Sequence, residues 1–116
     1  MGSEPTKITE LIRLLQQINP DKVLFKGRKG DKDPFLFMDS IGLTNYEDGK
    51  MIIKNLTKYE CIREYAPDDN PKNPYHVWIF IHNYYLHPCD PPIPIYIKLQ
   101  PIESTIIVAI SFHEDK

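Results

Sequence analysis

The chain has 116 residues, 41% of them hydrophobic and 26% charged, which indicates one globular domain over 1–116. Its formal net charge of −2 argues against a protein that holds nucleic acid by overall charge, so such a site would need a local basic patch. Because two cysteines cannot build a disulfide framework and no apolar run approaches the roughly 20 residues that cross a bilayer, we expect a cytoplasmic protein without a membrane partner.

The first half of the chain, over 6–58, is predicted to be mainly helical, after a flexible tail or cloning remnant over 1–5. Apolar residues recur at three- and four-residue intervals and form one stripe of an amphipathic helix: Ile8, Leu11, Ile12, Leu15 and Ile18. Asn19-Pro20 ends this helix, because the residue before a proline avoids the helical region. The next apolar segment, over 23–25, is either a short strand or an extended tether.

A basic, glycine-containing loop follows over 26–33. Its basic side chains are Lys26, Arg28, Lys29 and Lys32. A loop of this composition is ordinarily a solvated connection, and the alternative is a mobile arm that contacts nucleic-acid phosphates. Lys26, Arg28 and Lys29 are therefore candidate RNA-backbone contacts.

Two further helices are predicted before the strands begin. The segment over 35–41 is apolar enough for a short helix, and Gly42 is well placed to end it in the left-handed conformation. Thr44 and Glu47 have the spacing of a capping box, in which each side chain satisfies an amide at the start of a helix. A second helix is therefore expected to begin at this pair.

The region over 59–116 is predicted to form an antiparallel sheet of three to four strands. Between Tyr75 and His82, bulky residues occupy both alternating sets, which predicts an interior strand covered on both faces. The segments over 95–100 and 106–113 alternate more cleanly and predict a hairpin around Glu103-Ser104. Helices followed by strands indicate an α+β fold, with the helices packed on the sheet.

The register of this hairpin is predicted by matching the apolar faces of its strands. The expected apolar pairs are Leu99 with Val108, Ile97 with Ile110, and Ile95 with Phe112. The same register places Tyr96 opposite Ser111 and brings His113 diagonally within reach of Tyr96. The polar face of the hairpin would then carry Tyr96, Lys98, Ser111 and His113.

This polar face offers a phenol, an ammonium, a hydroxyl and an imidazole, which are the groups needed to cleave RNA without a metal. Such cleavage needs a base for the 2′-hydroxyl proton, a cation for the charge on phosphorus, and an acid for the leaving oxygen. Tyr96 and His113 are candidates for proton transfer, and Lys98 and Ser111 for substrate binding. The alternative is an ordinary exposed sheet face, on which polar residues are expected anyway.

Metal and cofactor chemistry finds little support in the residue spacing. His82, His87 and Cys89 would converge on one ion only if the loop after Tyr84 folded back, and their spacing is not that of a known zinc site. The chain also lacks a phosphate-cradling glycine motif. We predict neither a metal nor a cofactor.

Five short motifs, taken in chain order, carry a likeness to a known family. They are Ser40-Ile41-Gly42-Leu43-Thr44, Ile53-Lys54-Asn55-Leu56-Thr57, Trp78-Ile79-Phe80, Ile95-Tyr96-Ile97-Lys98-Leu99 and Ile110-Ser111-Phe112-His113-Glu114. In this order they resemble the MqsR-type toxins of bacterial type II toxin–antitoxin systems. The resemblance covers roughly 35–114 and implies a RelE/ParE-like fold, metal-independent cleavage of messenger RNA, and neutralisation by a cognate antitoxin protein.

The resemblance also implies three active residues. The family's basic residue just past the second helix falls on Arg63, the tyrosine of its Tyr-x-Lys strand is Tyr96, and the basic residue after its final Ser-Phe is His113. Two departures are notable. Some members have a glutamine where this chain has Ile79, and some have a lysine at the position of His113.

Two functions follow as hypotheses. The first is an mRNA interferase, an endoribonuclease that cleaves single-stranded RNA without a metal. The second is a non-catalytic binding module that keeps the toxin-like fold and engages a protein partner through its sheet face or edge. The missing glutamine and the proline-rich connection over 84–94 motivate the second hypothesis.

Overall fold

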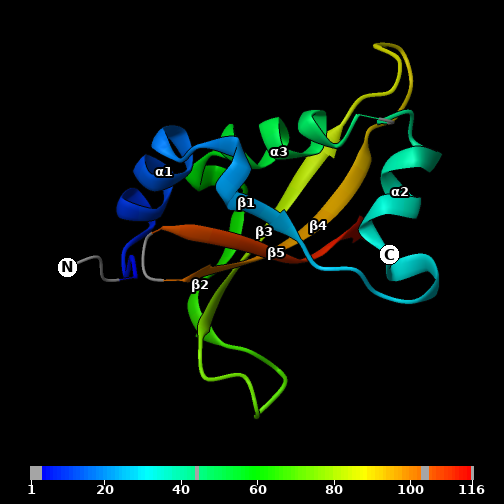
Figure 1. Cartoon of the computed structure of the whole chain (residues 1–116). Helices are drawn as coiled ribbons and strands as arrows, with labels where there is room; N and C mark the ends of the chain where they lie inside the picture. The colour runs from blue at the N-terminus through cyan, green and yellow to red at the C-terminus, as the bar shows by residue number, and fades with distance from the viewer. Residues whose placement is uncertain (1–3, 44, 103–104, 116) are drawn as a thin grey trace.

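The computed structural model of the chain describes residues 4–43, 45–102 and 105–115 and has an α+β fold, as predicted (Figure 1). Within these ranges the helices are α1 (Ile8–Gln17), α2 (Pro34–Ser40) and α3 (Tyr46–Lys54). The strands are β1 (Val23–Phe25), β2 (Cys61–Pro67), β3 (His76–Tyr84), β4 (Ile93–Ile102) and β5 (Ile106–Glu114). None of the helices described is long and apolar enough to cross a membrane.

The strands form one mixed sheet in the order β1-β5-β4-β3-β2. The prediction of three to four antiparallel strands is therefore wrong, because the sheet has five strands and β1 runs parallel to β5. The sequence predicts either a strand or a tether over 23–25. The segment is strand β1, in which Val23 pairs with Ile107. A three-residue apolar run is too short for periodicity to identify. The interior position predicted for β3 is confirmed, since it lies between β2 and β4.

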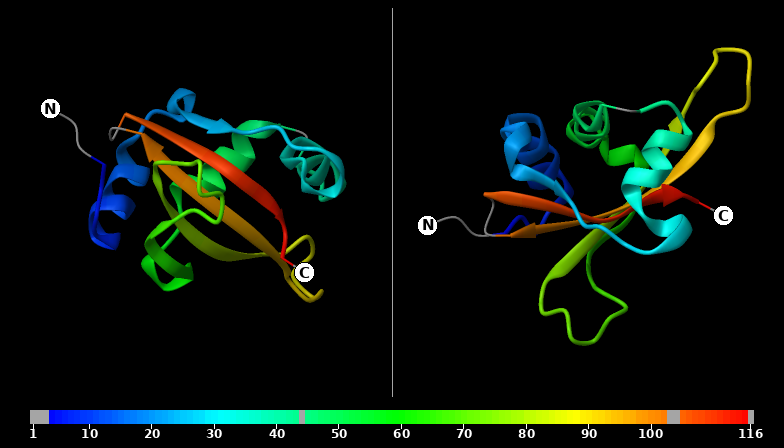
Figure 2. Two further views of the ribbon diagram at one scale, coloured as in Figure 1. Left: turned by 90° about the horizontal axis from the view of Figure 1, so that it is seen from below. Right: turned by 45° about the vertical axis from the view of Figure 1, so that its right-hand side comes forward.

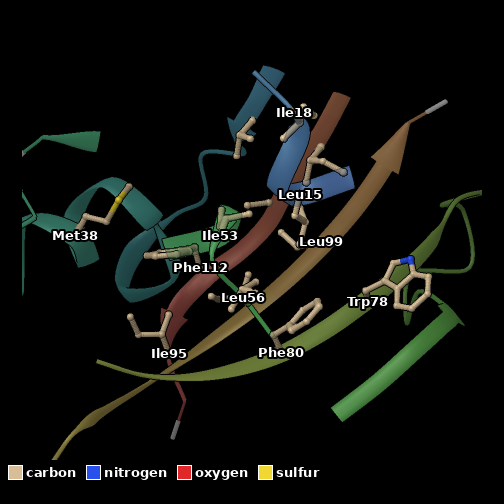
Figure 3. Packing of buried hydrophobic residues seen from close by; sticks show 14 of the residues in the cluster. Leu15, Ile18, Met38, Ile53, Leu56, Trp78, Phe80, Ile95, Leu99 and Phe112 are labelled. Carbon is tan, nitrogen blue, oxygen red and sulfur yellow. The ribbon is translucent and has the colours of Figure 1, made fainter. Parts of the chain in front are cut away.

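The three helices cover one face of the sheet, and the loop between β2 and β3 lies on the opposite side (Figure 2, right). Between helices and sheet lies one hydrophobic core, seen from close by in Figure 3. Its fully buried side chains include Leu11, Leu15, Met38, Ile53, Trp78, Phe80, Ile97, Leu99 and Phe112. We call the helix-covered surface the inner face of the sheet and the opposite surface the outer face.

The helix ends follow local sequence rules. Gly42 ends α2 with a φ of 85°, in the left-handed conformation predicted for it. Thr44, the predicted first member of a capping box, lies outside the described residues. Asn45 caps α3 instead, and its side-chain oxygen accepts a hydrogen bond from the Glu47 amide at 3.0 Å.

Residues at the start of the described chain are held against the sheet. Pro5 is buried, and the Tyr65 hydroxyl donates a hydrogen bond to Glu4 Oε1 at 2.8 Å. His76 Nδ1 lies 3.5 Å from the same carboxylate oxygen. The sequence predicts a flexible tail over 1–5. Of that tail, 1–3 lie outside the described residues, and residues 4 and 5 make these contacts.

The register predicted for the β4–β5 hairpin is wrong. Leu99 lies opposite Ala109 rather than Val108, and Ile97 lies opposite Phe112 rather than Ile110. Ile95, predicted to face Phe112, instead pairs with Glu114. On the polar side Tyr96 faces His113 directly, and Lys98 faces Ser111.

Two features shift this register. The strands close with Ile102 opposite Ile106, so three residues connect them instead of two. A β-bulge then leaves Ile110 without a partner, since Lys98 pairs with Ser111 and Leu99 with Ala109. The extra residue of the connection exchanges the inward and outward sets between Ile106 and Ala109, and the bulge restores the predicted orientation from Ser111 onward. Ile107, Ala109 and Phe112 are therefore the buried residues of its inner face.

Candidate functional site

Tyr96 and His113 form a stacked pair on the outer face of the sheet. They are direct cross-strand partners, and their rings are nearly parallel, with centroids 5.3 Å apart and an interplanar angle of 16°. Both side chains are partly exposed. The stack holds a phenol and an imidazole next to each other on a rigid hairpin.

The His113 ring has one nitrogen fixed by the backbone. Its Nδ1 lies 3.0 Å from the carbonyl oxygen of Glu114. A carbonyl oxygen only accepts hydrogen bonds, so Nδ1 must carry the hydrogen. Nε2 is then the nitrogen that exchanges a proton with a bound molecule.

The next cross-strand pair is Lys98 with Ser111, and an arginine from the 26–33 loop packs over it. Arg28 Nη1 donates a hydrogen bond to Ser111 Oγ at 3.1 Å, and Ser111 is only 3% exposed. The loop begins as a continuation of β1, because the Lys26 amide donates to the Ala109 carbonyl at 3.0 Å. Basic residues from a distant segment thus reach the outer face of the hairpin.

Lys98 is paired with a carboxylate from the loop between β2 and β3, which lies on the same outer face. Its Nζ donates to Asp68 Oδ1 at 2.9 Å, and the two side chains are 13% and 10% exposed. Burial alone would raise the pKa of Asp68. Hydrogen bonds from Asn73 and Lys98 outweigh burial and hold that pKa below its ordinary value of 3.8.

These residues line a groove of about 400 Å³ on the outer face, which we call the basic groove. Its lining residues are Lys26, Arg28, Lys32, Asp68, Asp69, Asn70, Tyr96, Lys98, Ile110, Ser111 and His113. Four basic side chains face two carboxylates there, although the whole chain has a net charge of −2. The groove is therefore the kind of local basic patch that an anionic ligand requires.

A second hollow, of about 630 Å³, adjoins the basic groove. Tyr96 and His113 line both spaces, and Leu36, Phe37 and Ser40 of α2 line the second one. Asp31, Glu114 and Asp115 also line the second hollow, so the stacked pair separates a basic groove from a hollow with apolar and acidic walls. A chain-like ligand that crosses the pair would meet both surfaces.

The structure brings most of the predicted site residues together. Six of them line the basic groove: Lys26, Arg28, Tyr96, Lys98, Ser111 and His113. Lys29 is exposed and is not among the lining residues. Arg63 is also outside the groove. It lies on edge strand β2 opposite Ile79, and because Ile79 pairs with Lys98, the backbones of Arg63 and Lys98 are about 10 Å apart.

Sequence reasoning missed several groove residues. Lys32 belongs to the basic loop over 26–33, and the basic composition of that loop was the signal that could have identified it. Asp68, Asp69 and Asn70 come from a proline-flanked loop, and Asp68 meets Lys98 across 30 positions of sequence. Local patterns carry no signal for such a contact.

Among the described residues, neither Cys61 nor any group of metal-binding side chains forms a second candidate site. Burial raises the pKa of the Cys61 thiol to about 11, so the reactive thiolate is disfavoured. Across 4–43, 45–102 and 105–115, no three His, Cys, Asp or Glu side chains are grouped so that they could hold a metal ion.

Comparisons with protein-family models, with curated proteins and with solved structures find no match to this chain. The function is therefore inferred from the site.

The Asp68–Lys98 pair predicts a pH dependence of stability. The folded-state pKa of Asp68 lies below its unfolded value, so its ionisation stabilises the fold above about pH 4 and this contribution is lost as pH falls further. Chemical unfolding of the protein and of Asp68→Asn should differ most near neutral pH and converge in acid. A difference that stays constant between pH 7 and pH 3 would contradict this assignment.

Proposed function

We propose that the protein is an endoribonuclease that cleaves single-stranded RNA at the Tyr96–His113 pair without using a metal. The observation that supports this proposal is the position of the stacked pair beside Lys98, Ser111 and Arg28 in a basic groove. Proton-transfer groups and phosphate-binding cations then lie within one site. An RNA backbone in the groove would place a phosphate near Arg28 and Lys98.

The proposed reaction uses the RNA's own 2′-hydroxyl as nucleophile. His113 Nε2 takes the 2′-hydroxyl proton, the 2′-oxygen attacks phosphorus, and the bond from phosphorus to the 5′-oxygen breaks. The Tyr96 hydroxyl protonates this leaving oxygen, and solvent returns the proton from His113 to Tyr96. The products would be a 2′,3′-cyclic phosphate and a 5′-hydroxyl. Arg28 and Lys98 stabilise the negative charge that develops on the phosphate oxygens.

The resemblance of the sequence to MqsR-type toxins agrees with this proposal. The packing of the helices on one face of the sheet agrees with what the resemblance implies, whereas the five-stranded mixed sheet differs from the antiparallel sheet that was expected. We extend the proposal accordingly to a cytoplasmic toxin, an mRNA interferase that a cognate antitoxin neutralises. In this proposal Arg28, which donates to Ser111, is the arginine that binds the phosphate. Arg63 lies on β2 outside the basic groove and has no assigned step.

The second candidate function is a non-catalytic protein-binding module. Two observations favour it: Lys98 is already neutralised by Asp68, and Arg63 stands outside the basic groove. Induced expression in a bacterium separates the two functions. An active toxin arrests growth and the double variant Tyr96→Phe, His113→Ala does not, whereas a binding module gives the same result for both chains.

The proposal predicts RNA cleavage in the presence of a chelator. Purified protein incubated with a single-stranded RNA oligonucleotide and excess EDTA should produce shorter fragments, because every group in the proposed reaction belongs to the chain or to the RNA. Gel electrophoresis of end-labelled RNA checks this. An RNA that stays intact with EDTA but is cut after addition of Mg²⁺ would contradict the mechanism.

A further inference from the structure

The loop over 68–75, which joins β2 to β3, closes over the outer face as a strap. Two side-chain links hold it to β4: Asp68 accepts from Lys98 at 2.9 Å, and Asn73 Nδ2 donates to Gln100 Oε1 at 2.6 Å. Asn73 Nδ2 also lies 3.0 Å from Asp68 Oδ2, which connects the two links. We refer to this segment as the strap.

Hydrogen bonds within the strap brace its backbone. The Asn73 amide donates to the Asn70 carbonyl at 3.0 Å, and the Tyr75 amide donates to Asn73 Oδ1 at 3.1 Å. Pro71 and Pro74 further restrict its backbone. Asp68 is therefore presented to Lys98 by a preorganised loop.

The carboxylate of Asp68 takes the place that a phosphate oxygen would need. Lys98 is one of the two cations beside Ser111, and its ammonium is bound to the carboxylate of Asp68. A carboxylate and a phosphate oxygen are equivalent partners for an ammonium. Since both members of the pair are nearly buried, a nucleic acid that binds Lys98 competes with Asp68 for its ammonium.

We propose that the strap is an autoinhibitory element, in which Asp68 acts as an internal mimic of the RNA phosphate at Lys98. This inference rests on the proposed RNA-cleaving function and names a regulation of the same site. RNA binding would require the strap to open at both links. Any partner that holds the strap away from β4 would activate the site, and one that clamps it would silence the site.

Affinity for an uncleavable RNA tests the inference. The probe is a fluorescent single-stranded oligonucleotide with 2′-O-methyl groups throughout, and binding is followed by fluorescence anisotropy. Asp68→Asn should bind about tenfold more tightly than the unaltered chain, because the freed ammonium gains a charge-assisted hydrogen bond to phosphate. Asn73→Ala should also bind more tightly, since it removes the link to Gln100 and the hydrogen bond that braces Asp68, without changing the charge.

Glu64→Gln is the matched control, because Glu64 is an exposed carboxylate on β2 outside the basic groove. It removes the same charge and should change affinity by no more than about twofold. The gain from Asp68→Asn should vanish when Lys98→Met is added.

Three results would overturn the inference. The first is an Asp68→Asn affinity no higher than that of Glu64→Gln, and the second is a gain that survives Lys98→Met. Either would leave the proposed function intact if the unaltered chain still cuts RNA. The third is an absence of binding and cleavage by every variant, which would remove the proposed function as well.

Discussion

Replacing His113 with alanine is expected to lower the rate of RNA cleavage by about 10²–10⁴-fold, the range typical of a lost general acid–base group. The change removes Nε2, the ring nitrogen left available by the bond from Nδ1 to the Glu114 carbonyl. Initial rates on a labelled single-stranded RNA, measured in EDTA, provide the test. The double variant with Tyr96→Phe should show no cleavage above background.

The controls for this prediction separate chemistry from folding. His87→Ala removes an exposed imidazole from the loop between β3 and β4 and should cleave at the unaltered rate. Tyr96→Phe alone keeps the aromatic ring beside His113, so a loss of rate in this variant reports the hydroxyl. If His113→Ala cut RNA as fast as His87→Ala, His113 would have no part in the reaction.

Truncation of Phe112 to alanine is expected to destabilise the fold by about 3–5 kcal/mol. Phe112 is fully buried, and its ring centroid lies 5.3 Å from that of Phe25 and 6.0 Å from that of Phe37. It therefore joins β5 to both β1 and α2. The loss would be a large share of the roughly 5–15 kcal/mol that stabilises a typical domain, and denaturant unfolding followed by circular dichroism measures it.

Ile110→Ala is the comparison that makes the Phe112 result informative about register. Ile110 is the bulged residue and is only half-buried, on the outer face. Its truncation should cost about 1 kcal/mol, well below the Phe112 value. Equal costs for Ile110→Ala and Phe112→Ala would support the unbulged register expected from the apolar pattern and contradict the one described above.

The sequence predicted the general fold and much of the candidate site because those features depend on local patterns. Strict alternation in β4 identified Tyr96 and Lys98 as residues of one face, and the closing strand supplied Ser111 and His113. Gly42 was found because few other residues adopt its backbone conformation. Each of these inferences needed only neighbouring residues.

The features that the sequence did not predict are of two kinds. Some depend on contacts between distant segments, and one is the strand register, which a run of apolar residues on both faces does not specify. The run over 106–110 is apolar on both faces, so it gave no sign that a longer connection and a bulge would turn Ile107 and Ala109 inward in place of Val108 and Ile110. The parallel pairing of Val23 with Ile107 and the contact of Asp68 with Lys98 join segments far apart in the chain. The prediction of Arg63 as an active residue came from the resemblance alone. Arg63 lies outside the basic groove, and its role stays a prediction.

The chemical identity of the RNA ends tests the central claim most directly. A synthetic RNA is incubated with the protein in EDTA, its fragments are analysed by mass spectrometry, and the experiment is repeated with a single 2′-deoxynucleotide on the 5′ side of the cut. We predict a 2′,3′-cyclic phosphate and a 5′-hydroxyl, and no cut at the deoxy position. Fragments with a 3′-hydroxyl and a 5′-phosphate, or continued cleavage at the deoxy position, would contradict proton abstraction from the 2′-hydroxyl by His113.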